Sequence, residues 1–220
     1  MKKSIREFLV RVVILCVGLI IAHFGVTLFL LSNLGGDPFN VFIQGIFRSL
    51  QKVFSHPLLT HGNVHVAVSV LILIVLLFTD KSYIRVGTLI CMICGGPIID
   101  FFTLLLQPLF DAMPALWFRL VTLALGCGIL AFGMTLVIRS EAGTGPNDLV
   151  AVVISDKLRK KFSIVRVIVD CFFVLIGFLL GGTAGIGTIV CAFLVGPVAG
   201  LCMPVSEGIV RSLVIRFGRK

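Results

Sequence analysis

Long apolar segments separated by short polar stretches make up most of this 220-residue chain. Segments of about 20 apolar residues match the roughly 30 Å hydrocarbon thickness of a bilayer. A chain in lipid must satisfy its own backbone hydrogen bonds, which favours helices. The pattern therefore predicts an all-α, polytopic membrane helix bundle. Six spans are expected, at residues 9–31, 63–79, 86–106, 119–138, 163–181 and 186–205.

Residues 38–54 contain too many polar side chains for a lipid-facing span, and their apolar residues recur with the period of an amphipathic helix. We expect short amphipathic or re-entrant helices here and at 146–160. An alternative with eight spans, in which both segments cross the membrane, leaves the balance of basic residues between the two sides unchanged and stays open. The polar residues of the first segment are Asn40, Gln44, Arg48, Gln51 and Lys52.

The chain is 58% hydrophobic and 13% charged, with a net charge of +9. Soluble domains carry about a quarter charged residues, so this composition excludes an ordinary soluble domain. The basic residues lie between the apolar segments and at the two ends, which argues against nucleic acid as a partner. By the positive-inside rule, both termini are expected in the cytoplasm. The basic start is expected to stay with the first span, because no small-residue cleavage site ends its apolar run.

Two pairs of motifs recur in the same order along the chain. "LGGDPFN" at 34–40 matches "AGTGPND" at 142–148, and "GTLICMICGGP" at 87–97 matches "GTIVCAFLVGP" at 187–197. One such match arises easily by chance, whereas two in the same order indicate an internal duplication.

The duplication divides the chain into two membrane repeats, at 1–110 and 111–205, followed by a basic amphipathic cytoplasmic tail at 206–220. Three spans per repeat is an odd number, so the second repeat must enter the membrane upside down. Inverted repeats are typical of transporters, in which broken helices meet near the substrate.

Each Gly-x-x-Pro motif has the chemistry of a helix start. Proline is favoured in the first turn, Asp37 is placed to cap a helix that begins at Pro38, and the glycines allow tight turns. Helix N-termini carry free N–H groups that bind anions, although ordinary capped turns would look the same. The candidate substrate-binding residues are Gly35, Asp37, Pro38, Asn40, Gly143, Gly145, Pro146, Asn147, Asp148 and Arg166.

Ionisable residues inside spans are costly and therefore need a reason. Asp170 lies within the fifth expected span, and Arg166 precedes it by four residues on the same helical face. Asp100 lies in the third span and His23 in the first. Asp100, Asp170 and His23 are candidates for ion or proton coupling; the alternative is structural pairing across the bundle.

The sequence carries no pattern that indicates an enzyme. Neither a Ser-His-Asp order, a His-Glu-x-x-His motif nor a phosphate-binding loop is present. All seven cysteines lie in apolar segments, and the Cys91-x-x-Cys94 pair has no acidic or histidine partner at ligand spacing. We therefore expect no catalytic activity, no cofactor and no metal site.

The stretches "LGGDPFNVFIQGI" and "AGTGPNDLVAVVI", together with the size and the span pattern, resemble the bacterial YczE-type membrane proteins, grouped with the YyaS and YitT proteins. The resemblance covers most of the chain and implies an integral protein of the bacterial plasma (inner) membrane, without an assured activity. Asn40 departs from the family pattern, because an acid is common there.

A small-solute transporter or permease is the leading expectation, with a small polar or anionic solute bound near the helix starts. One alternative is a substrate-binding membrane subunit of a multicomponent importer, and another is a membrane scaffold or regulator without transport. The expected partners are the lipid bilayer, the solute, and a second copy of the chain or an energising subunit.

Overall fold

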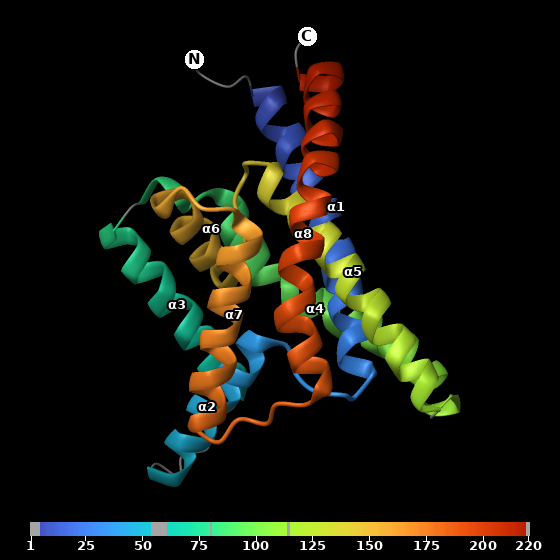
Figure 1. Cartoon of the computed structure of the whole chain (residues 1–220). Coiled ribbons are helices and arrows are strands. Elements are labelled where there is room, and N and C mark those ends of the chain that lie inside the picture. The colour runs from blue at the N-terminus through green and yellow to red at the C-terminus, as the bar shows by residue number, and fades with distance from the viewer. Residues whose placement is uncertain (1–4, 54–60, 80, 114, 219–220) are drawn as a thin grey trace.

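The computed structural model is a bundle of helices with no strand in the part of the chain that it describes, residues 5–53, 61–79, 81–113 and 115–218 (Figure 1). The all-α prediction is confirmed over these residues. The elements are α1 (Ile5–Leu31), α2 (Pro38–Val53), α3 (His61–Thr79), the 3-10 turn η1 (Lys81–Tyr83), α4 (Val86–Ala112), α5 (Leu116–Arg139), α6 (Pro146–Leu158), α7 (Phe162–Leu179), α8 (Ile186–Leu213) and the π-helical turn η2 (Val214–Gly218).

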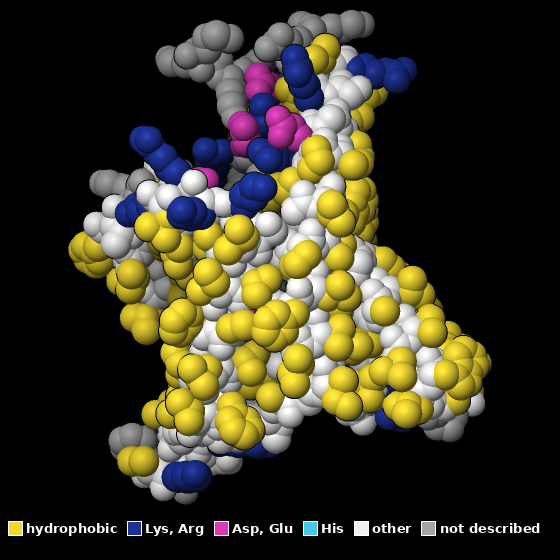
Figure 2. Space-filling model, viewed as in Figure 1, with side chains coloured by type: hydrophobic (Ala, Val, Ile, Leu, Met, Phe, Trp, Pro, Cys, Tyr) yellow, Lys and Arg dark blue, Asp and Glu magenta, His cyan; other side chains and the backbone are white. Residues whose placement is uncertain are grey.

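Five of the described helices are long and apolar enough to cross a bilayer: α1, α4, α5, α7 and α8 with η2. A sixth expected span forms the shorter apolar helix Asn63–Thr79 within α3. Hydrophobic side chains cover the middle of the visible face, while charged side chains gather at its two ends (Figure 2). This distribution is that of a multi-pass membrane protein.

The segment expected as a cytoplasmic tail, from residue 206 on, continues α8 to Leu213 and then forms η2. Ser206 is fully buried, and its hydroxyl lies 2.7 Å from the Thr135 hydroxyl of α5. Glu207 forms a 3.3 Å ion pair with Arg139. Polar partners on α5 therefore allow α8 to extend past residue 205, where the apolar sequence pattern ends.

The polar side of α2 is bound to the loop between α7 and α8. The Arg48 guanidinium donates to the Gly181 carbonyl at 2.7 Å, and the Ser49 hydroxyl donates to the Leu180 carbonyl at 3.0 Å. Gln44 accepts hydrogen bonds from the backbone N–H and the hydroxyl of Thr183, at 2.7 and 2.6 Å. The polar residues that mark this segment as amphipathic thus connect two distant parts of the chain.

Helices α1 and α5 run in opposite directions and cross at glycines. A Cβ at Gly25 would lie 2.4 Å from the Leu130 backbone nitrogen, and one at Gly133 would lie 2.3 Å from that of Ala22. Such distances are not tolerated between real atoms, so only glycine permits this approach. Small residues serve the same purpose in other membrane helix pairs, because close backbone contact maximises dispersion attraction.

The two Gly-x-x-Pro loops have matching backbone geometry. Gly35 and Gly143, which lie 108 residues apart, both have φ of +142°. Asn33 and Glu141, each two residues earlier, have φ of 54° and 55°. These conformations favour glycine and tolerate few other residues, so their recurrence in one order is a specific local match.

Each loop also accepts a hydrogen bond from the start of a distant helix. The Leu34 carbonyl accepts from the Gly187 N–H of α8 at 2.9 Å. The Ala142 carbonyl accepts from the Gly87 N–H of α4 at the same distance. The loop after α1 thus joins α8, and the loop after α5 joins α4.

An alanine substitution should destabilise the protein at a glycine of the α1–α5 crossing, but not at a glycine whose Cβ would have free space. Gly25→Ala is expected to lower stability by about 1–3 kcal/mol, because its Cβ would overlap backbone atoms of α5. Gly128→Ala, also in a helix, places its Cβ more than 4 Å from the described atoms outside its own stretch of helix and should be neutral or slightly stabilising. Thermal unfolding in detergent measures both. Equal midpoints for the two variants would contradict the close crossing.

Candidate functional site

A buried arginine bridges two carboxylates inside the apolar bundle. Arg166 of α7 donates from Nε to Asp170 at 2.8 Å and from a terminal nitrogen to Asp148 of α6 at 2.5 Å. The side chains of Arg166 and Asp170 are 8% and 0% exposed, and that of Asp148 is 19% exposed. We call these three residues the charge cluster.

Local structure accounts for the meeting of these residues. Helix α6 begins at Pro146, where the missing N–H is harmless, and Asp148 lies in its first turn. The chain then reverses through Arg159, which has φ of 52°, and the Ser155 hydroxyl donates to the Lys160 carbonyl at 2.8 Å. This tight turn places α7 against α6.

If all three groups of the charge cluster are ionised, its two carboxylates are balanced by a single positive charge. Two carboxylates share one guanidinium, and Asp170 Oδ1 has no hydrogen-bond partner among the described residues. The buried hydroxyl of Thr144, just before α6, also has none there. Unsatisfied buried polar atoms cost free energy, so the Asp170 oxygen favours a proton or a hydrogen-bond donor, and the Thr144 hydroxyl favours a hydrogen-bond partner.

At the start of α2, free backbone N–H groups are hydrogen-bonded by a side chain of the same segment. Asp37 accepts hydrogen bonds from the backbone N–H groups of Phe39 and Asn40, at 3.1 and 3.2 Å, as expected of an N-cap. The Asn40 side-chain amide also donates to Asp37. Pro38 is buried in the first turn of α2.

At the start of α6, Gly145 occupies the position of Asp37 and supplies no side-chain cap. Asn147 lies beside it, with Oδ1 3.0 Å from where a Gly145 Cβ would lie. Gly143 permits close contact with α4, since its Cβ would approach the Thr88 nitrogen to 2.4 Å. The start of α6 therefore differs from that of α2 in having no side-chain cap.

His23 faces α4 from α1. Its Nδ1 lies 2.8 Å from the Leu19 carbonyl, which can only accept, so Nδ1 carries the proton. In the neutral ring, Nε2 then has a free lone pair, and it faces Gly95.

Asp100 lies away from these contacts. It is exposed on α4, and it forms no hydrogen bond or ion pair within the described part of the chain. Its place in the third expected span does not bring it into the charge cluster.

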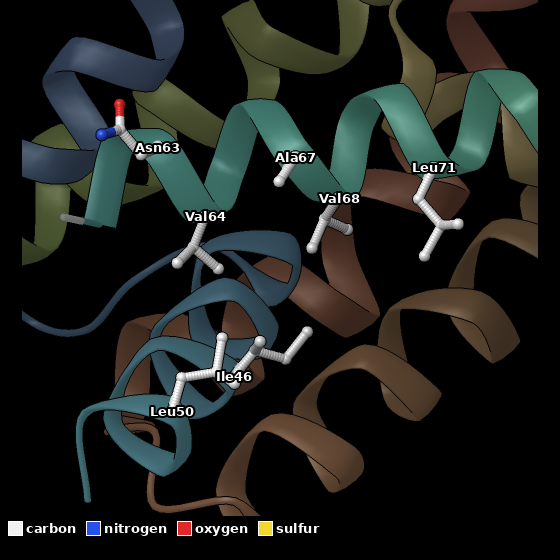
Figure 3. Close-up of a pocket in the computed structure, with 7 residues that line it drawn as sticks. All are labelled: Ile46, Leu50, Asn63, Val64, Ala67, Val68 and Leu71. Atoms are coloured by element: carbon white, nitrogen blue, oxygen red, sulfur yellow. The ribbon is translucent and has the colours of Figure 1, made fainter. Parts of the chain in front are cut away.

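The described residues form two apolar grooves, and the charge cluster lines neither. One, of about 360 Å³, lies between α2 and α3; Val64, Val68 and Leu71 point toward α2, while Asn63 points away from it (Figure 3). The other, of about 530 Å³, lies between α1 and α4 beside Pro97. Their linings suit hydrocarbon chains and do not provide a polar site.

The chain matches the family described as "Family of unknown function (DUF6198)" over residues 9–204. It belongs to this family. No solved structure matches the chain significantly.

Three bacterial relatives align with most of the chain. The uncharacterized membrane protein YczE of Bacillus subtilis is 27% identical, over 96% of this chain and 94% of its own length. The uncharacterized protein YyaS of the same organism is 24% identical, over 87% and 91%. An uncharacterized protein of Haemophilus influenzae is 30% identical, over 84% and 79%. The resemblance inferred from the two motifs is thereby confirmed.

Sequence reasoning anticipated only part of the charge cluster. The four-residue spacing of Arg166 and Asp170 indicated a pair on one helix face. The contact from Asp148 carries no such signal, because it depends on the turn between α6 and α7. The buried hydroxyl of Thr144 was likewise not singled out.

Removing the bridging guanidinium should destabilise the protein strongly. Arg166→Met leaves two carboxylates without their partner, and breaking a buried ion pair costs about 3–5 kcal/mol. Arg159→Met, at an exposed position in the adjacent turn, is the matched control and should change the midpoint of thermal unfolding little. The double variant Arg166→Met/Asp170→Asn should recover part of the loss. Arg166→Met and Arg159→Met with the same midpoint would refute the bridge.

Proposed function

We propose that this membrane protein is a small-solute transporter or permease built from two inverted three-span repeats. The observation that carries the proposal is the charge cluster, in which Arg166 links Asp148 and Asp170 inside an apolar bundle. Ionisable groups at such depth are typical of ion and substrate pathways. The uncapped start of α6 adds free backbone donors beside them.

Matching local geometry supports the inverted repeat. Gly35 and Gly143 share a φ of +142°, and each loop accepts a hydrogen bond from the start of a helix in the other half. Helices α1 and α5, the first of each half, cross in opposite directions. A pseudo-two-fold axis in the membrane plane would relate elements in this way.

The distribution of charge supports cytoplasmic termini in the bacterial inner membrane. Most visible Lys and Arg side chains gather at the end of the molecule that carries both termini (Figures 1 and 2). Positively charged ends face the cytoplasm in most multi-pass proteins.

The residues of the site would have separate roles in solute binding and proton coupling. Arg166 and the α6 start would contact an anionic or polar group of the solute, and Asp148 would orient Arg166. Asp170 would carry the coupling proton, because its buried Oδ1 has no hydrogen-bond partner in the described ranges of the chain. Asp100 is the weaker candidate for this role, since it is exposed.

Labelling from the two sides of the membrane tests the topology. In a chain without native cysteines, Lys52→Cys and Lys157→Cys introduce exposed thiols at the ends of α2 and α6. Six spans place them on opposite sides, so an impermeant maleimide should label residue 52 in intact cells and residue 157 only after permeabilisation. Labelling of both from one side would favour eight spans and overturn the inversion.

Uptake into proteoliposomes tests the mechanism. With a pooled metabolite mixture outside and an imposed proton gradient, mass spectrometry of the lumen should reveal an accumulated solute. Asp148→Asn and Asp170→Asn should lower uptake at least tenfold while preserving the elution profile, because each removes a charge from the cluster. Asp111→Asn, at an exposed residue bonded to Gln107, is the matched control.

Wild-type uptake in both cluster variants would remove these residues from the mechanism. Absence of uptake by the wild-type protein together with a co-purifying ATPase would favour a binding subunit. Absence of any ligand-induced thermal shift across the mixture would favour a scaffold.

A further inference from the structure

The turn between α6 and α7 carries a cluster of unpaired positive charge. Four of the five residues at 157–161 are basic, and all four are exposed: Lys157, Arg159, Lys160 and Lys161. None of their side chains forms an ion pair or a hydrogen bond within the described ranges of the chain. We call these four residues the basic turn.

The acidic residue next to the basic turn is hydrogen-bonded to another element. Asp156 accepts a hydrogen bond from the Tyr83 hydroxyl of η1 at 3.1 Å. With four basic residues and one acid, the segment 156–161 has a net charge of +3. Like charges this close together repel one another, so an anion from outside the chain would stabilise them.

The backbone holds the basic turn in a fixed conformation. The Ser155 hydroxyl donates to the Lys160 carbonyl at 2.8 Å, and the Lys160 N–H donates to the Ser155 carbonyl at 3.1 Å. Lys157 and Arg159 lie at the C-terminal end of α6, where cations are favourable. Lys160 and Lys161 precede α7, whose N-terminal end is itself partly positive, so these two cations favour an anion nearby.

An apolar side chain projects from the middle of the basic turn. Leu158 is 61% exposed although cations flank it on both sides. Lys and Arg side chains gather along the upper edge of the apolar surface, close to where α6 leads into α7 (Figures 1 and 2). The headgroup region of a bilayer begins at such an edge. A leucine there can insert among acyl chains while the cations stay at the level of the headgroups.

We propose that the basic turn binds the phosphate headgroup of an anionic phospholipid, with Leu158 inserted between the acyl chains. Basic segments beside membrane-spanning helices are attracted to anionic headgroups. A zwitterionic lipid has no net charge to balance the four cations, so the lipid is of the anionic class, such as phosphatidylglycerol. A soluble phosphate would leave Leu158 exposed to water.

Lipid bound at the basic turn stabilises the folded hairpin of α6 and α7. This hairpin holds Asp148 against Arg166 in the charge cluster. The lipid composition of the membrane therefore affects the stability of the cluster, whichever solute the protein carries. Lipid binding does not require transport, so either can be refuted without the other.

Thermal unfolding of the full-length protein in a neutral detergent, with phosphatidylglycerol added in steps, tests the site. Phosphatidylglycerol should raise the unfolding midpoint of the wild type, and phosphatidylcholine should not. The variant Lys157→Gln/Lys160→Gln/Lys161→Gln should need at least tenfold more phosphatidylglycerol for the same rise, because each basic residue near an anionic surface contributes to binding. Leu158→Ser should also need more of the lipid.

The matched control, Arg6→Gln/Arg211→Gln/Arg216→Gln, removes three exposed cations from the part of the molecule that carries the two termini. Its response to phosphatidylglycerol should equal that of the wild type. An equal loss of response in both triple variants would overturn the site, since the lipid would then follow the overall charge. An equal rise of the wild-type midpoint with phosphatidylcholine or with water-soluble glycerol phosphate would overturn the choice of an anionic phospholipid.

Discussion

Hydrocarbon around the protein provides no water to satisfy polar groups, and this constraint governs every feature of the structure. Backbone groups are satisfied within helices, which accounts for the all-α fold. The polar residues Gln44, Arg48 and Ser49 of α2 find their partners on the α7–α8 loop. The same constraint explains why Arg166 lies between two carboxylates.

Glycine supplies the close contacts that hydrophobic burial cannot supply between helices in lipid. Association there depends on dispersion and on hydrogen bonds between closely approaching backbones. The crossing at Gly25, the loop at Gly143 and the interface at Gly196 each leave no room for a Cβ. Such interfaces lose little side-chain entropy when they form.

The sequence allowed the apolar helices and the N-cap at Asp37 to be predicted, because each depends on residues close together in the chain. Contacts between distant elements could not be predicted in this way. Asp100 is exposed on α4, and the mostly apolar sequence of this helix does not determine which of its faces is exposed. The extension of α8 beyond residue 205 depends on partners such as Thr135, which lie on another helix.

The two Gly-x-x-Pro loops share their φ angles at two positions but differ from each other in the charges nearby. Every member of the charge cluster has an uncharged counterpart: Asn40 for Asp148 at a spacing of 108 residues, and Val66 and Val70 for Arg166 and Asp170 at a spacing of 100. Asp37 caps the start of α2 with its side chain, whereas the start of α6 has no side-chain cap. A single buried charge cluster avoids the desolvation penalty that a second one would add.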